Sequence, residues 1–233
     1  MKSLLNFVLF GGLVGLIVLD ANALDVAQVV PPQAIADNQL KIGNRVLRLP
    51  DGGWNFVAQK MGDVTNTNTN LKIGTTFRAY AMDVKDSDFR GGIQLLLPVA
   101  SFFTNGWRPE PCKVDNVLYK NDFNSGFSTP ECLMVFKRTS HLRRPTDEFY
   151  SQASQWAVNE KVKVSGAFYE IVYTKYATND YGNIRIWIPV SSVVGDEAAI
   201  AWAQTLPDRL RRLFENRDSD AVLPSFPFKP VPN

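Results

Sequence analysis

Two apolar runs between Phe168 and Pro189 constrain the fold of this chain more than any other stretch. The runs FYEIVYTKYA and IRIWIP are rich in Ile, Val, Tyr and Trp, and the cluster TNDYGN lies between them. Strand-forming runs on either side of Asn, Asp and Gly are typical of a β-hairpin. Ile184, Ile186 and Ile188 share one face of the second strand, because side chains alternate along a strand. This apolar face requires a second layer of structure to cover it.

Two amphipathic segments flank the hairpin and are the candidates for that layer. Residues 146–160 begin with Thr146, the expected N-cap, and two acidic residues follow it, where they favour a helix dipole. Residues 196–217 carry an apolar stripe that is interrupted by Pro207. Because proline breaks the helical hydrogen-bond ladder, this segment either kinks there or starts a new helix with Pro207 in its first turn.

Several other runs have strand character, and they span residues 46–49, 54–59, 71–84, 93–99 and 132–137. The turn 51–53 is expected to join the first two into a hairpin, and residues 85–92 are expected to join the next two around a longer loop. Runs of hairpins with helices inserted late indicate an α+β fold. We expect an antiparallel β-sheet of hairpins with two or three helices packed on one face, and polar residues on the other. The expected polar residues are Arg78, Glu170, Lys175 and Arg185.

The first 23 residues have the pattern of a secretory signal peptide. Lys2 precedes an apolar run, and Ala21 and Ala23 are the small residues required for a cut after Ala23. An uncleaved membrane anchor is the alternative, because the run approaches the length of a short spanning helix. Cleavage predicts a periplasmic or secreted protein without a membrane span. Beyond the signal peptide (1–23) we expect an extended lead-in (24–44), a single α+β domain (45–217) and a Pro-rich tail (218–233).

The chain has two cysteines, Cys112 and Cys132. In an exported protein an even cysteine count favours a disulfide, and closing a loop of this length stabilises a fold by about 3 kcal/mol in the chain-entropy treatment. Two free buried thiols are the alternative. A catalytic thiol is disfavoured, since neither cysteine lies in a C-x-x-C pair or beside a histidine. We therefore interpret the pair as a structural disulfide.

Composition and motifs argue against several functional classes. The formal net charge of +2 gives no bulk bias toward nucleic acids or membrane surfaces. His141 is the only histidine, which rules out multi-His metal sites, and the sequence lacks nucleophile-elbow and phosphate-loop motifs. Asp83, Asp86 and Asp88 suggest a calcium loop, but the downstream acidic ligand is missing and turn formation is favoured. We expect no metal, no cofactor and no nucleic-acid partner.

Binding through residues 100–132 is the favoured functional hypothesis. This region is rich in aromatic residues, which more often pack over a sheet edge, but Trp and Arg also dominate interfaces. The candidate binding residues are Trp107, Arg108, Tyr119, His141 and Arg143. The expected function is that of an exported, non-catalytic binding or envelope-associated protein with an unknown protein or small-ligand partner. The alternative is an envelope hydrolase that uses carboxylates or His141.

Overall fold

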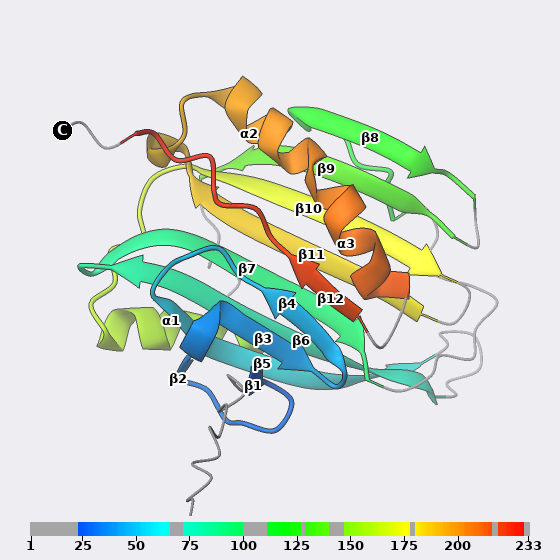
Figure 1. Ribbon diagram of the computed structural model, residues 1–233, viewed down its shortest axis with the longest axis horizontal. Coiled ribbons are helices and arrows are strands. Elements are labelled where there is room, and N and C mark those ends of the chain that lie inside the picture. Colours follow the sequence, from blue (N-terminus) through cyan, green and yellow to red (C-terminus); the bar gives the residue numbers. More distant parts are fainter. Residues whose placement is uncertain are drawn as a thin grey trace, which may run out of the picture.

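The computed structural model describes residues 23–65, 72–99, 111–126, 129–139, 147–177, 180–215 and 219–230. These residues form two β-sheets and three α-helices (Figure 1). Neighbouring strands of the larger sheet are all antiparallel. The prediction of an α+β fold built on an antiparallel sheet is confirmed. No helix in the described ranges is long and apolar enough to cross a membrane.

The larger sheet contains β2 (Gln33–Ala34), β5 (Trp54–Thr65), β6 (Lys72–Lys85), β7 (Asp88–Pro98), β8 (Tyr119–Asn124), β9 (Glu131–Arg138), β10 (Phe168–Ala177) and β11 (Asp180–Pro189). The smaller sheet contains β1 (Leu24–Asp25), β3 (Gln39–Ile42), β4 (Arg45–Arg48) and β12 (Ser219–Val222). The helices are α1 (Glu148–Asn159), α2 (Asp196–Gln204) and α3 (Leu206–Glu215), and two short 3₁₀ turns span Ala36–Asn38 and Val190–Ser192. The strand orders are β2-β5-β6-β7-β11-β10-β9-β8 and β1-β3-β4-β12.

The expected central hairpin forms from β10 and β11, and it is longer than the sequence indicated. Ala177 pairs with Asp180, so most of the residues that we assigned to the turn belong to β11. Gly182 lies in this strand because the ring of Phe214 in α3 occupies the space of a side chain: an added Cβ would lie 2.0 Å from it. A glycine that permits such a close approach looks the same in sequence as a turn glycine.

Helices cover both faces of the larger sheet rather than one (Figure 1). We call the face that carries Ile184 and Ile186 the α3 face, because these residues pack with Leu206 and Leu210. The opposite face, the α1 face, carries Trp187, which belongs to a separate apolar cluster that includes α1. The prediction of helices over the isoleucine face therefore holds for α2 and α3, and α1 lies on the other side.

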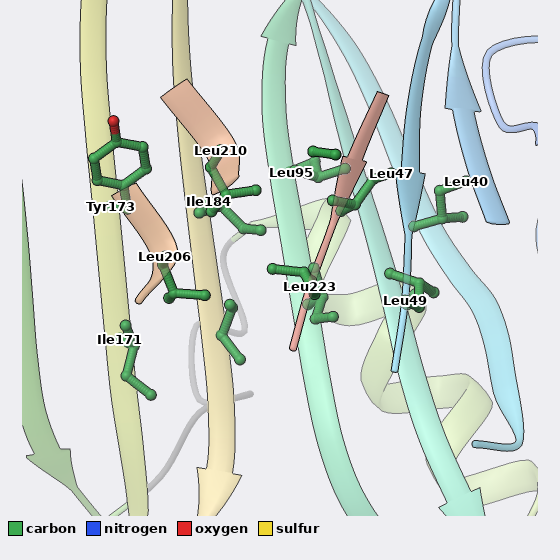
Figure 2. Close-up of a cluster of buried hydrophobic side chains, with 14 of the residues drawn as sticks. Leu40, Leu47, Leu49, Leu95, Ile171, Tyr173, Ile184, Leu206, Leu210 and Leu223 are labelled. Carbon is green, nitrogen blue, oxygen red and sulfur yellow. The ribbon is translucent and has the colours of Figure 1, made fainter. Parts of the chain in front are cut away.

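The main apolar core lies between the α3 face and a second layer made of α3 and the smaller sheet (Figure 2). In Figure 2, Leu95 of the larger sheet points toward Leu47 of β4, and Ile184 points toward Leu210 of α3. Each of these side chains is at most 2% exposed. Burying one leucine or isoleucine contributes about 1.5–3 kcal/mol, so this layer holds much of the folding free energy.

The expected lead-in and tail contribute to this core. β3 pairs with β4 in a hairpin, and β12 runs parallel to β4 on its other side. Val26 and Leu40 are buried on the N-terminal side, as are Leu223 and Phe226 on the C-terminal side. The ring of Phe226 contacts two tryptophans, one from β5 and one from α2. Segments at both ends of the domain are therefore part of one packed unit rather than extended.

The turn predicted between β4 and β5 does not make a hairpin. β4 pairs with β3 and β12, whereas β5 pairs with β2 and β6. Pro50 and residues 51–53 instead carry the chain from the smaller sheet to the larger one. Asp83 fixes this corner, because its carboxylate accepts a hydrogen bond from the backbone N–H of Gly53 at 2.8 Å.

The β6–β7 turn is shorter than expected. Lys85 pairs with Asp88, so the turn consists of two residues, Asp86 and Ser87. Both have positive φ (53° and 64°), which is typical of the tight type I′ hairpin turn. Asp86 therefore serves the turn, while Asp88 lies 3.6 Å from the ammonium group of Lys163.

The helix boundaries confirm one of the two alternatives for Pro207. α2 ends at Gln204 and α3 begins at Leu206, which places Pro207 in the first turn of a new helix. α1 is capped by Asp147, whose side chain accepts a hydrogen bond from the N–H of Phe149. The cap is thus one residue later than predicted, and Thr146 lies outside the described residues.

Gly182→Ala is expected to lower the free energy of unfolding by about 3 kcal/mol, because a methyl group here forces α3 away from β11. Gly62→Ala in β5 is the matched control, since its nearest neighbour would be Thr76 Oγ1 at 3.9 Å. The control should change stability by less than about 1 kcal/mol. Urea unfolding of both variants gives the measurement, and equal effects would contradict the close approach of Phe214.

Candidate functional site

Four of the five predicted binding residues, Trp107, Arg108, His141 and Arg143, lie outside the described residues. The fifth, Tyr119, begins β8 and pairs with Val135. It is half-buried and packs against the main core on the α3 face. Their role in binding stays a prediction.

The predicted disulfide between Cys112 and Cys132 is confirmed, with the two Cα atoms 5.9 Å apart. Cys132 is fully buried at the start of β9, and together with Met134 and Phe136 it belongs to a small apolar cluster. Cys112 packs against the same cluster from the loop side. The bond therefore holds residues 111–114 over the α1 face, at the end of the sheet formed by β9 and β10.

A cleft of about 570 Å³ opens at this place, and its volume lies within the range of about 300–1,000 Å³ that is typical of small-molecule sites. Its floor comes from β7, β9, β10 and β11, and its wall includes Pro111, Lys113 and Val114 from the disulfide-held segment. The apolar residues of the floor are Met134 and Val172, which lie opposite each other, and Leu96, which lies opposite Asn183 in the next row. α1 packs on the same face but on the side of β5, and no described helix contributes a residue to the lining of the cleft.

Strand register explains why these residues share one floor. Val172 of β10 lies opposite Met134 of β9 on one side and Arg185 of β11 on the other. Thr174 lies opposite Asn183 in the next row on this face. Residues directly opposite each other in a sheet point to the same side. The floor is therefore fixed by backbone pairing.

Glu170 forms the centre of the charged end of the cleft. The Nε of Arg138 donates a hydrogen bond to Oε2 of Glu170 at 3.2 Å, and Nη1 of Arg185 donates to Oε1 at 2.8 Å. Glu170 is 8% exposed, whereas the arginine side chains are 44% and 33% exposed. The guanidinium of Arg138 also lies 4.3 Å from the ring centroid of Phe136. Two oriented guanidinium groups thus converge on one buried carboxylate.

The arginine pair retains unused hydrogen-bond donors. A guanidinium has five N–H donors, and each of these two arginines gives one to Glu170. No other described residue accepts a hydrogen bond from either group. This end of the cleft can therefore donate to an additional oxyanion.

The other end of the cleft is polar but uncharged. Asn183 Nδ2 donates to Thr174 Oγ1 at 2.7 Å, and the rings of Tyr176 and Tyr181 meet edge to face at 5.6 Å. Burial raises the pKa of the Tyr181 hydroxyl, so it is neutral at physiological pH. Thr174 and Glu170 are four residues apart on β10, which at about 3.3 Å per residue separates the two ends by about 13 Å.

A second buried glutamate, Glu131, lies on the α3 face and has a structural role. Its carboxylate accepts hydrogen bonds from Tyr173 at 2.9 Å, Lys175 at 2.6 Å and Arg211 at 2.8 and 3.0 Å. Burial alone would raise the pKa of Glu131, but the bonds from Arg211, Lys175 and Tyr173 lower it below its usual value. Lys175 also contacts Glu215 of α3 at 3.0 Å. This cluster ties α3 to the ends of β9 and β10, and it places Lys175 on the opposite face from Arg185.

One group of potential metal ligands occurs among the described residues: Cys112, Asp122 and Cys132. Both sulfurs belong to the disulfide, and a metal requires the thiolate. The structure therefore supports no zinc-type centre here in the oxidised protein.

The described residues of the cleft do not bring two carboxylates together. Glu170 is the one carboxylate among its described lining residues, and an arginine binds each of its oxygens. Hydrolysis by paired carboxylates requires a second acidic group within about 5–9.5 Å of the first. The version that uses His141 stays a prediction, because this residue lies outside the described ranges.

Sequence reasoning identified Glu170 and Arg185 only as residues of a polar face and missed Arg138, Thr174 and Asn183. Polar residues within the otherwise apolar runs of β10 and β11 are a signal that could have found Thr174 and Asn183, whereas Arg138 ends β9 and has no such signal. A polar residue inside a buried strand needs a partner, and the partner marks a site.

Comparison with known proteins assigns no family to this chain. No family model matches the sequence, and neither a curated protein nor a solved structure matches it. Any function must therefore be argued from the sequence and the cleft.

Glu131→Gln is expected to destabilise the protein by about 3 kcal/mol at pH 7, because it leaves Lys175 and Arg211 without their shared carboxylate. The lowered pKa means that this stabilisation is complete above about pH 4.5 and is lost as the pH falls. The difference from wild type should shrink toward pH 3. Glu215→Gln, which removes a more exposed carboxylate, should cost less than about 1 kcal/mol. Urea unfolding across this pH range checks both, and a pH-independent difference would count against the cluster.

Proposed function

We propose that this chain is an exported, non-catalytic binding protein that holds a small ligand in the cleft over β7, β9, β10 and β11. The observation that carries the proposal is the floor of this cleft. Apolar side chains of Met134 and Val172 lie there between two polar ends, Leu96 adds apolar surface opposite Asn183, and no described helix contributes to the lining. A concave, mainly pre-formed site with a few convergent polar groups is typical of small-molecule binding.

The disulfide-held segment supports a binding role for the loop region 100–132. Pro111, Lys113 and Val114 line the cleft, and the bond from Cys112 fixes their position. A wall that is held covalently loses little conformational entropy when a ligand binds, which favours affinity. The hypothesis of loop-mediated binding thus gains a physical basis in the described part of the loop.

Export is the second part of the proposal. The signal-peptide pattern of residues 1–23 and the Cys112–Cys132 disulfide both fit an oxidising compartment, either periplasmic or extracellular. No corresponding observation favours the hydrolase alternative.

Leu96→Trp is expected to weaken ligand binding by about tenfold or more, because the larger ring fills the floor of the cleft. The neutral apolar dye N-phenyl-1-naphthylamine serves as the probe, and fluorescence titration gives its affinity. Met61→Trp is the matched control, since Met61 is an exposed apolar residue of β5 outside the cleft. Saturable binding that survives Leu96→Trp unchanged, or no binding by the wild type, would refute the proposal.

Mass spectrometry of the protein purified from its native host is expected to give a chain that begins at Leu24, with no thiol available to an alkylating reagent. This result follows from cleavage after Ala23 and an intact Cys112–Cys132 bond. A chain that retains Met1 and has two alkylatable cysteines would overturn the assigned compartment.

A further inference from the structure

We infer that the ligand of the cleft is an elongated amphiphile with one oxyanion group, which Arg138 and Arg185 bind while its apolar body lies over Met134 and Val172. This inference rests on the proposed function and adds the chemical class of the ligand. It comes from the placement of charge along the floor.

The charge of the cleft favours an anion. Its described lining residues include three cations, Arg138, Arg185 and Lys113, and one carboxylate, Glu170. An anionic group would bring the site closer to neutrality, whereas a cationic group would face like charges. A neutral apolar group placed against the arginines would remove water from their N–H donors without replacing those hydrogen bonds, which costs free energy.

Contacts with neighbouring side chains orient Arg138 and Arg185 to bind an oxyanion. Arg138 on β9 and Arg185 on β11 reach Glu170 from opposite sides of β10. Glu170 holds one N–H of each group, and the ring of Phe136 supports the guanidinium plane of Arg138. Planar guanidinium groups bind carboxylate, sulfonate or phosphate oxygens through paired N–H donors. Glu170 acts as a positioning residue that orders the arginines before the ligand arrives.

The rest of the floor sets the shape of the ligand. Next to the arginine pair lie Met134 and Val172, and Leu96 lies farther along the floor opposite Asn183. These three side chains favour a hydrocarbon or aromatic body. About 13 Å along β10 from Glu170, Thr174 and Asn183 form the neutral polar end. A hydroxyl or amide group at the far end of the ligand could pair with them. A purely polar anion such as inorganic phosphate would leave the apolar part of the cleft unused.

Competition between the neutral dye and three twelve-carbon probes tests this inference. The probes are dodecanoate, dodecanol and dodecylamine, each used below its micelle threshold. Dodecanoate is expected to displace the dye from wild-type protein at a concentration about tenfold or more lower than dodecanol, because it gains charge-assisted hydrogen bonds. Dodecylamine should be the weakest competitor.

Two substitutions assign this preference to the arginines. Arg185→Gln and Arg138→Gln are each expected to reduce the advantage of dodecanoate over dodecanol by about tenfold, with dodecanol affinity nearly unchanged. Arg48→Gln is the control for the loss of an arginine charge, because Arg48 forms an exposed ion pair with Asp220 on the smaller sheet, outside the cleft. The preference should be intact in that variant.

The outcomes separate the inference from the proposed function. If the dye binds and dodecanol competes as well as dodecanoate, the anionic class is wrong and the binding function stands. If the dye does not bind to wild type, the proposed function itself fails. The wild-type probe series needs no substitution, so it decides the question even if an arginine variant does not fold. A preference that persists in both arginine variants would assign the anion to another site and overturn the inference.

Discussion

The contact between α3 and the β10–β11 hairpin determines the arrangement of the rest of the molecule. Phe214 packs on the backbone of β11 at Gly182 and stacks on Tyr173 of β10, with the ring centroids 5.6 Å apart. This contact fixes which face of the hairpin carries Ile184. Because side chains alternate along a strand, the same contact places Glu170, Val172 and Thr174 on the opposite face. The face on which the cleft lies thus follows from the packing of α3 on the opposite face of the sheet.

The size of the sheet explains why α1, the one described helix on the α1 face, covers only part of it. Eight strands about 4.8 Å apart extend over about 34 Å, whereas a helix with its side chains is about 10–12 Å wide. α1 covers the β5–β6 side, where Phe149 meets Tyr80 and Asp147 binds Arg78 at 3.0 Å. At the β9–β10 end, Pro111, Lys113 and Val114 of the disulfide-held segment line the cleft. Among the described residues, the cleft thus lies on a part of the α1 face that α1 does not cover.

Much of the fold could be predicted from the sequence, and the misses have physical causes. The alternation of Ile184, Ile186 and Ile188 and the cysteine pair were sufficient for the central hairpin and the disulfide, and the position of Pro207 gave the start of α3 as one of two alternatives. These are local signals. The β3–β4 hairpin is local and was overlooked, whereas the pairing of β4 with β12 was missed because it joins strands from opposite ends of the chain. Pairing at such separation leaves no local pattern.

The candidate site was less predictable than the fold for the same reason. Its residues come from four strands and one loop, and their proximity depends on register. Glu170 is a polar residue in an apolar run, so a sequence marks it as unusual. Its two arginines lie 32 positions before it and 15 after it, and no spacing rule connects such residues. Only the strand order brings them together.

The two buried glutamates of β9 and β10 show how the same interaction can serve structure or binding. Both Glu131 and Glu170 accept hydrogen bonds from two cationic side chains. Around Glu131 a tyrosine adds another bond, and Lys175 is almost buried with a second carboxylate beside it. Around Glu170 both arginines are partly exposed at an open cleft and keep most of their donors. Buried donors must find acceptors within the protein, whereas donors at an open cleft can also bind a ligand. The Glu131 cluster therefore stabilises the fold, and the Glu170 cluster is suited to bind an anion.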